Sequence, residues 1–296
     1  MFRAGIIKIL VPIYIITIFG LPLCIVVMPF LLTNSIGLRM ALLVIAPISY
    51  VITFIITAGL LSLPHQSAII KGRFPRNLDH PIYGRRYLYG LCWTAVYYFK
   101  PLYYIALTVP ILKKMLFRIF GYKGNINFTI YPDTWVRDLP LLNFGEGSYL
   151  SNRATIGTNM VLNNGFILVD GVTVEKKGLI GHLSMLGPGV YIGEHAEVGV
   201  GVAVGINVRL GNNSKVSPYC AINHGANIYD NSEVGTHSYI GGKTIIKENI
   251  VIPAASSIPS RVVINAQNDV LKYISLITND LNKLKEEMSK MIDENV

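Results

Sequence analysis

Four histidines in the C-terminal half of the chain are the side chains best suited to move a proton. They are His182, His195, His224 and His237. A neutral imidazole accepts a proton near neutral pH, as a general base must. No serine or cysteine stands in a recognisable nucleophile setting, and Cys24, Cys92 and Cys220 predict neither a disulfide framework nor a metal site. The predicted chemistry is therefore proton transfer by a histidine, with no metal.

A period of six residues organises the stretch that contains these histidines. Every sixth position from 144 to 252 is Phe, Leu, Ile or Val, in nineteen consecutive hexads without an insertion or deletion. This period fits neither a helix nor an alternating strand. It is typical of a β-helix, in which each short unit buries its apolar face by stacking on its neighbours. The first hexad position should point into the core, and the fourth, often Gly or Asn, should form the corner.

The hexads resemble those of the left-handed parallel β-helix of hexapeptide-repeat acyltransferases. In that family three hexads form one triangular coil, which implies that residues eighteen apart stack vertically. Other families, such as the γ-type carbonic anhydrases, share the fold with different chemistry. The expected fold class is an all-β left-handed parallel β-helix (hexapeptide repeat), preceded by an α-helical membrane hairpin and interfacial helices and followed by a C-terminal helix.

The implied stacking predicts His182 as the catalytic base. Glu146 and Asn164 fall in the same third-position column at steps of eighteen residues, and a polar group beside the ring can fix its tautomer. We therefore predict a catalytic set of His182, Asn164 and Glu146, with no cofactor-binding residue assigned. His224 is the alternative base, although no polar residue stands directly above or below it in its column. His195 falls at a fourth position, as does His237, and both are expected to be solvated corner residues.

A local resemblance gives the same histidine a role. Residues 181–187 read Gly-His-Leu-Ser-Met-Leu-Gly. This is similar to Gly-His-Leu-Thr-Tyr-Leu-Gly in the acetyltransferase domain of the bifunctional N-acetylglucosamine-1-phosphate uridyltransferases. The histidine of that segment is the catalytic base, which implies the same role for His182. Met185 replaces the tyrosine, and the assisting lysine and asparagine of that family have no match here.

Composition favours a membrane partner. The 296 residues are 51% hydrophobic and 15% charged, and their mean hydropathy is +0.45, which is too apolar for an ordinary soluble enzyme. Residues 1–123 carry thirteen Lys and Arg against one acid, a net +12, and residues 124–296 carry thirteen against sixteen, a net −3. A basic apolar segment beside a mildly acidic one favours an anionic membrane surface over nucleic acid.

Two apolar runs predict a membrane hairpin. Residues 9–32 and 40–63 are each long enough to cross a hydrocarbon core of about 30 Å. A cleaved signal peptide is the alternative for the first run, disfavoured because a second span follows at once. Basic residues flank the hairpin at both ends, so both ends should be cytoplasmic. The expected location is the inner (cytoplasmic) membrane, multi-pass, with the β-helix facing the cytoplasm.

The order of segments carries a further resemblance. After the hairpin come Gly-Arg-Phe-Pro at 72–75, an aromatic and basic segment, and Arg-Ile-Phe-Gly-Tyr-Lys-Gly at 118–124. With the hexads that follow, this order resembles the membrane-embedded terminal module of polylysine-synthetase-type nonribosomal peptide synthetases. The resemblance implies acyl or aminoacyl transfer from a thioester to an amine or hydroxyl at the membrane. The aromatic segment predicts two helices in the cytoplasmic leaflet, or alternatively a third span over 87–112.

The chain is thus divided into four predicted parts. They are a transmembrane hairpin (1–63), basic aromatic interfacial helices (64–123), the β-helix (124–261) and a C-terminal helix (262–296). That last part has apolar residues at alternating spacings of four and three, a heptad seam of Val270, Ile274, Ile277, Leu281, Leu284, Met288 and Met291. It predicts a coiled coil or, alternatively, an amphipathic helix packed on its own β-helix. The acyltransferase resemblance implies a homotrimer with the donor groove between neighbours.

These observations predict a membrane-anchored acyltransferase with a histidine base. The expected co-substrate is acetyl-CoA or another acyl thioester, with no tightly bound cofactor, and CoA and a carrier protein stay open as its source. The acceptor would be the hydroxyl or amine of a lipid-linked, glycan or peptide molecule at the lipid bilayer. The alternative is a non-catalytic β-helix scaffold or assembly module that holds a partner at the membrane.

Overall fold

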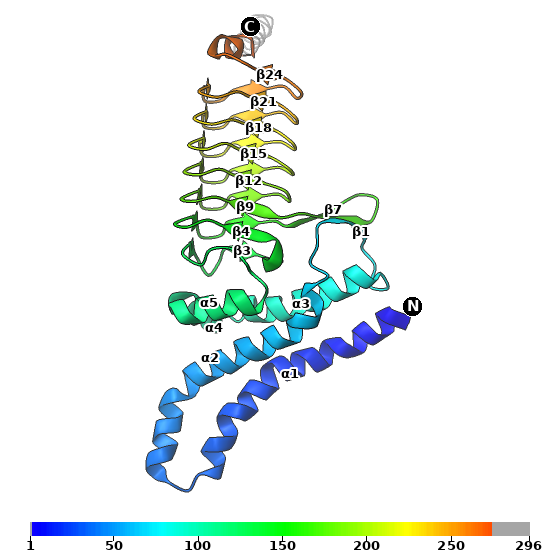
Figure 1. Cartoon of the computed structure of the whole chain (residues 1–296), viewed down its shortest axis with the longest axis vertical. Helices are drawn as coiled ribbons and strands as arrows, with labels where there is room; N and C mark the ends of the chain where they lie inside the picture. The colour runs from blue at the N-terminus through cyan, green and yellow to red at the C-terminus, as the bar shows by residue number, and fades with distance from the viewer. Residues whose placement is uncertain (1, 274–296) are drawn as a thin grey trace, which may run out of the picture. The chain divides into compact units, whose positions relative to one another are not determined.

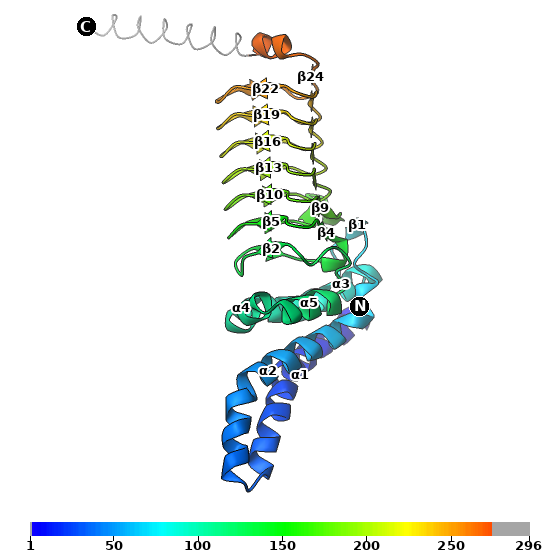
Figure 2. The same ribbon diagram turned by 60° about the vertical axis from the view of Figure 1, so that its left-hand side comes forward.

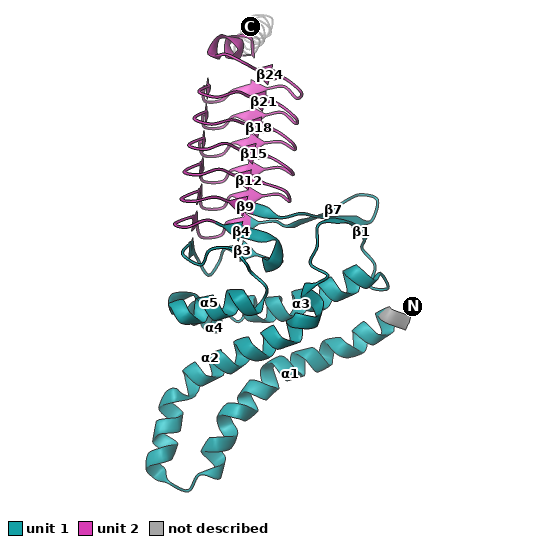
Figure 3. Cartoon of the chain, in the orientation of Figure 1, with its two compact units in different colours: residues 1–144, 156–172 teal, residues 145–155, 173–296 magenta. Residues whose placement is uncertain are grey.

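The computed structural model describes residues 2–273 of the chain. The chain divides into two compact units, coloured separately in Figure 3. Unit 1 consists of Met1–Phe144 and Ile156–Val172, and unit 2 of Gly145–Thr155 and Thr173–Val296. The second piece of unit 1 therefore interrupts the stretch that the hexad count treats as continuous.

Unit 1 begins with two long apolar helices (Figure 1). Helix α1 spans Phe2–Leu32 and α2 spans Ile36–Gln66, and the Ser35 side chain caps α2 by accepting the Leu38 N–H. By length and composition, these are the two helices of the described residues that could cross a membrane. Many of their large apolar side chains are exposed, Val44 by 79%. The predicted pair of N-terminal apolar helices is confirmed, and their membrane crossing stays a prediction.

Three shorter helices hold the aromatic core of unit 1. They are α3 (Pro81–Tyr98), α4 (Lys100–Thr108) and α5 (Pro110–Ile119). Each has a proline in its first turn, where a missing N–H is tolerated, so residues 87–112 do not form one continuous helix. Trp93 and Tyr103 are fully buried, with ring centroids 6.0 Å apart and edge to face. The segment thus forms three helices where two were predicted, and these two rings pack inside the protein. The interfacial location of the helices stays a prediction.

A small antiparallel sheet also belongs to unit 1. Its strands are β1 (Gly72–Pro75), β8 (Phe166–Val169) and β7 (Asn159–Val161), in that order, and β1 and β7 lie close together in Figure 1. Phe74, Ile167 and Val169 form its apolar cluster. Leu162 and Leu168, counted as first hexad positions, lie in this hairpin and are only half-buried. The prediction of nineteen uninterrupted hexads is wrong there, because an antiparallel ladder buries alternate residues.

The remaining short elements of unit 1 precede the hexads. They are β2 (Thr129–Ile130), β3 (Trp135–Val136), a 3-10 turn at Leu139–Leu141 and β4 (Leu142–Phe144). Two further strands fall where the units divide, β6 (Thr155–Ile156) and β9 (Val172–Val174).

Unit 2 is the body of the β-helix, with two-residue parallel strands stacked in three columns. The column that Figure 2 shows best contains β5 (Tyr149–Leu150), β10 (Leu179–Ile180), β13 (Glu197–Val198), β16 (Lys215–Val216), β19 (Glu233–Val234) and β22 (Val251–Ile252). The second contains β11 (Met185–Leu186), β14 (Ala203–Val204), β17 (Ala221–Ile222), β20 (Tyr239–Ile240) and β23 (Ser257–Ile258). The third contains β12 (Tyr191–Ile192), β15 (Arg209–Leu210), β18 (Asn227–Ile228), β21 (Ile245–Ile246) and β24 (Val263–Ile264).

The hexad positions in unit 2 behave as predicted. From β10 onward paired residues are eighteen apart, as in Ile180 with Val198, and both side chains are fully buried. Fourth positions adopt positive φ, 56° at His195 and 53° at Asn213, which is the left-handed corner. A helix occupies residues 267–273 after the last strand. The predicted fold class, a left-handed parallel β-helix between apolar N-terminal helices and a C-terminal helix, is confirmed.

Candidate functional site

His182 lies at a corner of unit 2, in the turn between β10 and β11. Its imidazole is half-buried, and in the described part of the chain its ring nitrogens have no hydrogen-bond partner. Leu183 makes the turn with φ 61°. At Gly181 a side chain would not fit, because a Cβ there would lie 2.5 Å from the Gly199 carbonyl carbon of the next coil. The tight stacking fixes the backbone around His182 and leaves its ring available to a molecule from solvent.

The residue beneath His182 is Asn152, and not Asn164. Strands β5 and β10 pair Leu150 with Ile180, thirty residues apart, and Leu183 N–H donates to the Asn152 carbonyl at 3.4 Å. The extra twelve residues (30 − 18) belong to the β7–β8 hairpin of unit 1. The third-position column therefore runs from Asn152 to His182.

The predicted stack of Glu146, Asn164 and His182 is wrong. Asn164 lies in the turn between β7 and β8, where its Oδ1 accepts the Phe166 N–H at 3.2 Å. Glu146 lies at another corner, with its carbonyl accepting the Lys177 N–H at 2.9 Å. A count in steps of six passes through the β7–β8 hairpin, which forms no part of a coil. It therefore assigns Glu146 and Asn164 to the wrong column.

Asn152 is a candidate that the sequence interpretation missed. Its Oδ1 is buried and has no hydrogen-bond partner among the described residues, so one polar atom beneath His182 is unsatisfied. A signal for it does exist in the sequence. Asn-Gly at 164–165, between apolar runs, is a hairpin signal, and removing that hairpin from the count brings Asn152 under His182.

His224 holds its proton on the wrong nitrogen for a base. Its Nδ1 accepts the Ile206 N–H at 2.9 Å, and Gly205 makes room, since a Cβ there would lie 2.5 Å from Nδ1. With Nδ1 accepting, the neutral ring must carry its proton on Nε2. Nε2 is then a donor, so this geometry favours His182 over His224 as the proton acceptor.

The His182 corner also differs from the other corners in the hydrogen bonds of its backbone amides. Elsewhere, third-position N–H groups donate to side chains of the next coil, at Glu194, Asn212, Ile206 and Gly242. Above His182 the next two third positions are Val200 and Pro218, whose side chains cannot accept. In the described part of the chain the amides of His182 and Val200 have no such cap. Two donors therefore face a half-exposed corner beside an unpartnered imidazole.

Exposed apolar side chains lie along the coils that follow this corner, from the coil of His182 to the third coil beyond it. Those exposed are Leu183, Met185, Tyr219 and Tyr239, by 41% to 59%. The Tyr219 ring lies over Gly201, where a Cβ would lie 2.9 Å from Cδ1, and it stacks on His237 at 5.3 Å. His195 and His237 are both exposed at positive φ, so their prediction as solvated corner residues is confirmed. An exposed apolar strip is typical of a contact surface.

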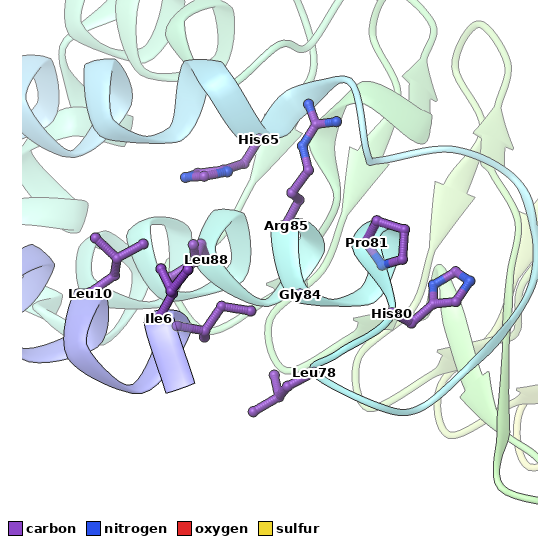
Figure 4. Close-up of a pocket in the computed structure, with 10 residues that line it drawn as sticks. Ile6, Leu10, His65, Leu78, His80, Pro81, Gly84, Arg85 and Leu88 are labelled. Carbon is purple, nitrogen blue, oxygen red and sulfur yellow. The ribbon is translucent and has the colours of Figure 1, made fainter. Parts of the chain in front are cut away.

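Unit 1 contains a cavity lined in part by two histidines that lie outside the hexads (Figure 4). Its volume is about 390 Å³, and its lining is Ile6, Ile7, Leu10, His65, Leu78, His80, Pro81, Gly84, Arg85 and Leu88. His65 Nε2 lies 2.8 Å from the Tyr14 hydroxyl. In the described part of the chain its Nδ1 and that of His80 are buried and have no hydrogen-bond partner. The cavity suits an apolar group with one polar end. His65 and His80 lie outside the hexads, so the six-residue period gives no signal for them.

In the part of the chain that the structure describes, no group of three or more His, Cys, Asp or Glu side chains could hold a metal ion. No protein-family model and no curated protein matches the chain.

Solved structures share the β-helix at low identity. The acetyltransferase domain of PglB from Neisseria gonorrhoeae is 19% identical over 31% of this chain and 45% of its own, with a TM-score of 0.31. PerB from Caulobacter crescentus, solved with CoA and GDP-perosamine, is 19% identical over 52% and 58%, at 0.27. UDP-N-acetylglucosamine acyltransferase from Campylobacter jejuni is 15% identical over 48% and 66%, at 0.26. The chain thus spans about half the length of the first of these. At such TM-scores the similarity carries no argument about its activity.

Proposed function

We propose that this chain is a membrane-anchored acyltransferase with His182 as its general base. The observation that carries the proposal is the His182 corner, where a half-exposed imidazole lies beside two backbone amides, and none of these groups has a hydrogen-bond partner among the described residues. The donor is an acyl thioester such as acetyl-CoA. The acceptor is a hydroxyl or amine of a molecule held at the membrane.

The reaction needs no covalent intermediate on the protein. The imidazole of His182 takes the proton of the acceptor hydroxyl or amine as that atom attacks the thioester carbonyl carbon. The amide of Val200 donates to the oxygen that becomes negative. The C–S bond then breaks, and the departing thiolate receives the proton from the imidazolium. Asn152, in place of Asn164, is the proposed positioning residue for the ring.

Helices α1 and α2 are the proposed anchor. Their exposed apolar side chains, such as Ile16 at 70% and Leu32 at 74%, suit lipid better than water. Residues 1–123 carry thirteen basic side chains against one acid, which favours a cytoplasmic location of both hairpin ends. The β-helix would then have direct access to cytosolic CoA.

A homotrimer is part of the proposal. The strip of Leu183, Met185, Tyr219 and Tyr239 would be covered by a second copy of the chain, which would close the His182 corner into a groove. Of the predicted heptad seam, Val270 is buried in the described helix, and the positions from Ile274 onward lie outside the described residues.

The test is acyl transfer by the purified full chain in nanodiscs of bacterial lipid extract. Labelled acetyl-CoA is the donor, thiol release gives the rate, and mass spectrometry of the lipid and glycan fraction identifies the acceptor. His182→Gln should lower the rate by about 10²–10⁴, and His195→Gln, at an exposed corner, should leave it unchanged. Equal rates for wild type and His182→Gln would overturn the base. Absence of transfer from any thioester by the wild type would favour the non-catalytic scaffold.

A further inference from the structure

Unit 1 has a polar cavity distinct from the one in Figure 4. Its volume is about 170 Å³, and its lining is Arg76, Tyr83, Arg86, Tyr87, Arg137, Asn159, Val161 and Ile167. These residues come from α3, from the chain after β1 and β3, and from the β7–β8 hairpin. Three of them are arginines and none is acidic, so the cavity gathers positive charge.

Arg86 is fixed at the cavity by a buried ion pair. Its side chain is 2% exposed, and Nη2 donates to Oδ2 of Asp138, which is fully buried. The same oxygen accepts the Thr158 hydroxyl. Nη1 of Arg86 is buried as well, and within residues 2–273 it has no acceptor. A buried charged donor without a partner is costly, and an acceptor inside the cavity would remove that cost.

Arg137 also lies close to the Asp138 carboxylate. Its Nε lies 3.7 Å from Asp138 Oδ1 and is buried, with no hydrogen bond to any residue that the structure describes. Helix α3 has a glycine where the guanidinium passes, because a Cβ at Gly90 would lie 2.5 Å from Nη2. The fold therefore makes room for Arg137 without supplying a full set of acceptors for it.

The charges around the cavity do not cancel. Asp138 is the one carboxylate that Arg86 and Arg137 contact, and Arg76 is exposed with no ion pair in the described residues. Three guanidinium groups against one carboxylate leave a surplus of two positive charges (3 − 1). A phosphomonoester carries about −1.5 to −2 at pH 7, so one such group would compensate for this surplus.

We propose that this cavity binds the phosphate group of a ligand. The guanidinium fork of arginine matches tetrahedral oxyanions with paired hydrogen bonds, and the Tyr83 and Tyr87 side chains line the same space. The volume is below the roughly 300–1,000 Å³ of sites for whole small molecules, so the cavity takes a headgroup rather than an entire ligand. The phosphate can belong to a lipid headgroup or to a water-soluble phosphate ester. This inference is independent of acyl transfer.

The first test is titration of inorganic phosphate into the full chain in dodecyl maltoside, whose headgroup has no phosphate. At constant ionic strength, calorimetry should show saturable binding that chloride does not reproduce. Arg137→Gln and Arg76→Gln should each weaken it by about tenfold. Arg73→Gln, an exposed arginine on β1 outside the cavity, is the matched control and should change nothing. No saturable binding, or an equal loss in Arg73→Gln, would overturn the proposal.

The second test separates the two sources of the phosphate. If the ligand is a lipid, phosphatidic acid added to the micelles should compete with inorganic phosphate, and native mass spectrometry should show a phospholipid on wild type that Arg137→Gln lacks. If it is a soluble ester, CoA should compete and phosphatidic acid should not. Competition by neither would overturn a phosphate-ester site and leave only an adventitious ion.

Discussion

Units 1 and 2 both bury polar groups, but they satisfy them differently. In unit 2 the groups are neutral hydroxyls that bond between adjacent coils: Ser232 Oγ donates to Lys247 O at 2.7 Å and accepts the Ile250 N–H at 3.1 Å. In unit 1 a charged pair, Arg86 and Asp138, joins residues 52 apart in sequence. A defect in a stacked repeat stays between neighbouring coils. Removing one partner of a buried ion pair leaves an uncompensated charge for the whole unit.

The largest difference should appear when the buried pair is broken. We expect Asp138→Asn to lower the free energy of unfolding of unit 1 by about 3–5 kcal/mol, because Arg86 keeps its charge at 2% exposure. The chain has two tryptophans, Trp93 and Trp135, and both lie in unit 1. Denaturant unfolding followed by tryptophan fluorescence therefore reports this unit alone.

Two controls sharpen that experiment. Lys215→Gln removes one partner of the pair with Glu233 in unit 2, which is 3.9 Å long and about half-exposed, and should cost under about 1 kcal/mol. The double replacement Arg86→Met with Asp138→Leu should recover most of the stability that Asp138→Asn loses, because no fully buried charge is then left without its partner. Arg137 also loses the Asp138 carboxylate, but its side chain is 30% exposed and reaches water. An Asp138→Asn variant as stable as wild type would contradict the contrast between the units.

The same contrast explains how much of the fold follows from sequence. From β10 onward the neighbours of each residue in unit 2 lie eighteen positions away, so the period alone predicts the buried first positions and the left-handed corners there. In unit 1 the partners are set by tertiary packing. Nothing in the sequence near Trp93 indicates that its Nε1 will donate to Val136 O, 43 residues later. An aromatic run beside basic residues is typical of a membrane interface and equally of a protein core.

The candidate site was predictable in part for the same reason. The third-position rule places His182 at a corner correctly, since its own coil is regular. It fails at Asn164 because one hairpin leaves the repeat, and two apolar residues of that hairpin, Leu162 and Leu168, keep the six-residue spacing by coincidence. The arginine cavity of unit 1 has no sequence signature. Its members Arg76, Arg86 and Arg137 are brought together only by the fold.

A smaller effect is expected inside the β-helix. Ser232→Ala removes a hydroxyl that is 1% exposed and leaves the Ile250 N–H without an acceptor, at a cost of about 1–3 kcal/mol. Hydrogen exchange measured by mass spectrometry should show faster exchange in peptides covering 232–250. Peptides from 180–200 should exchange at the wild-type rate, because the defect stays between adjacent coils.

Ser214→Ala is the matched control for that variant. Ser214 is equally buried, but its Oγ donates to Gly211 O within its own turn at 2.7 Å. Its loss leaves no amide of the next coil without an acceptor, so the rate of hydrogen exchange should rise less than in Ser232→Ala. Equal effects in the two variants would mean that hydroxyl bonds between coils do not hold the stack.

The smallest effect is expected at His224, and it tests why a histidine on this fold need not be a base. Its Nδ1 caps the Ile206 amide at 2.9 Å, and Asn212 caps Glu194 in the same way at 2.9 Å. His224→Ala should therefore cost about 0.5–1 kcal/mol, since water reaches this exposed corner, and His224→Asn should recover most of it by supplying an amide oxygen. Hydrogen exchange of the Ile206 amide measures both.

Acyl transfer by the two His224 variants decides between capping and catalysis. A ring that accepts at Nδ1 carries its proton on Nε2 and cannot take another without losing its cap. Both variants should then keep wild-type turnover, whereas His182→Gln does not. His224→Asn could restore wild-type hydrogen exchange of the Ile206 amide and still lose acyl transfer as completely as His182→Gln. The amide would then be capped although the activity is lost. The imidazole of His224 would then have a role in catalysis besides accepting the Ile206 N–H, and the general base would have to be reassigned to His224.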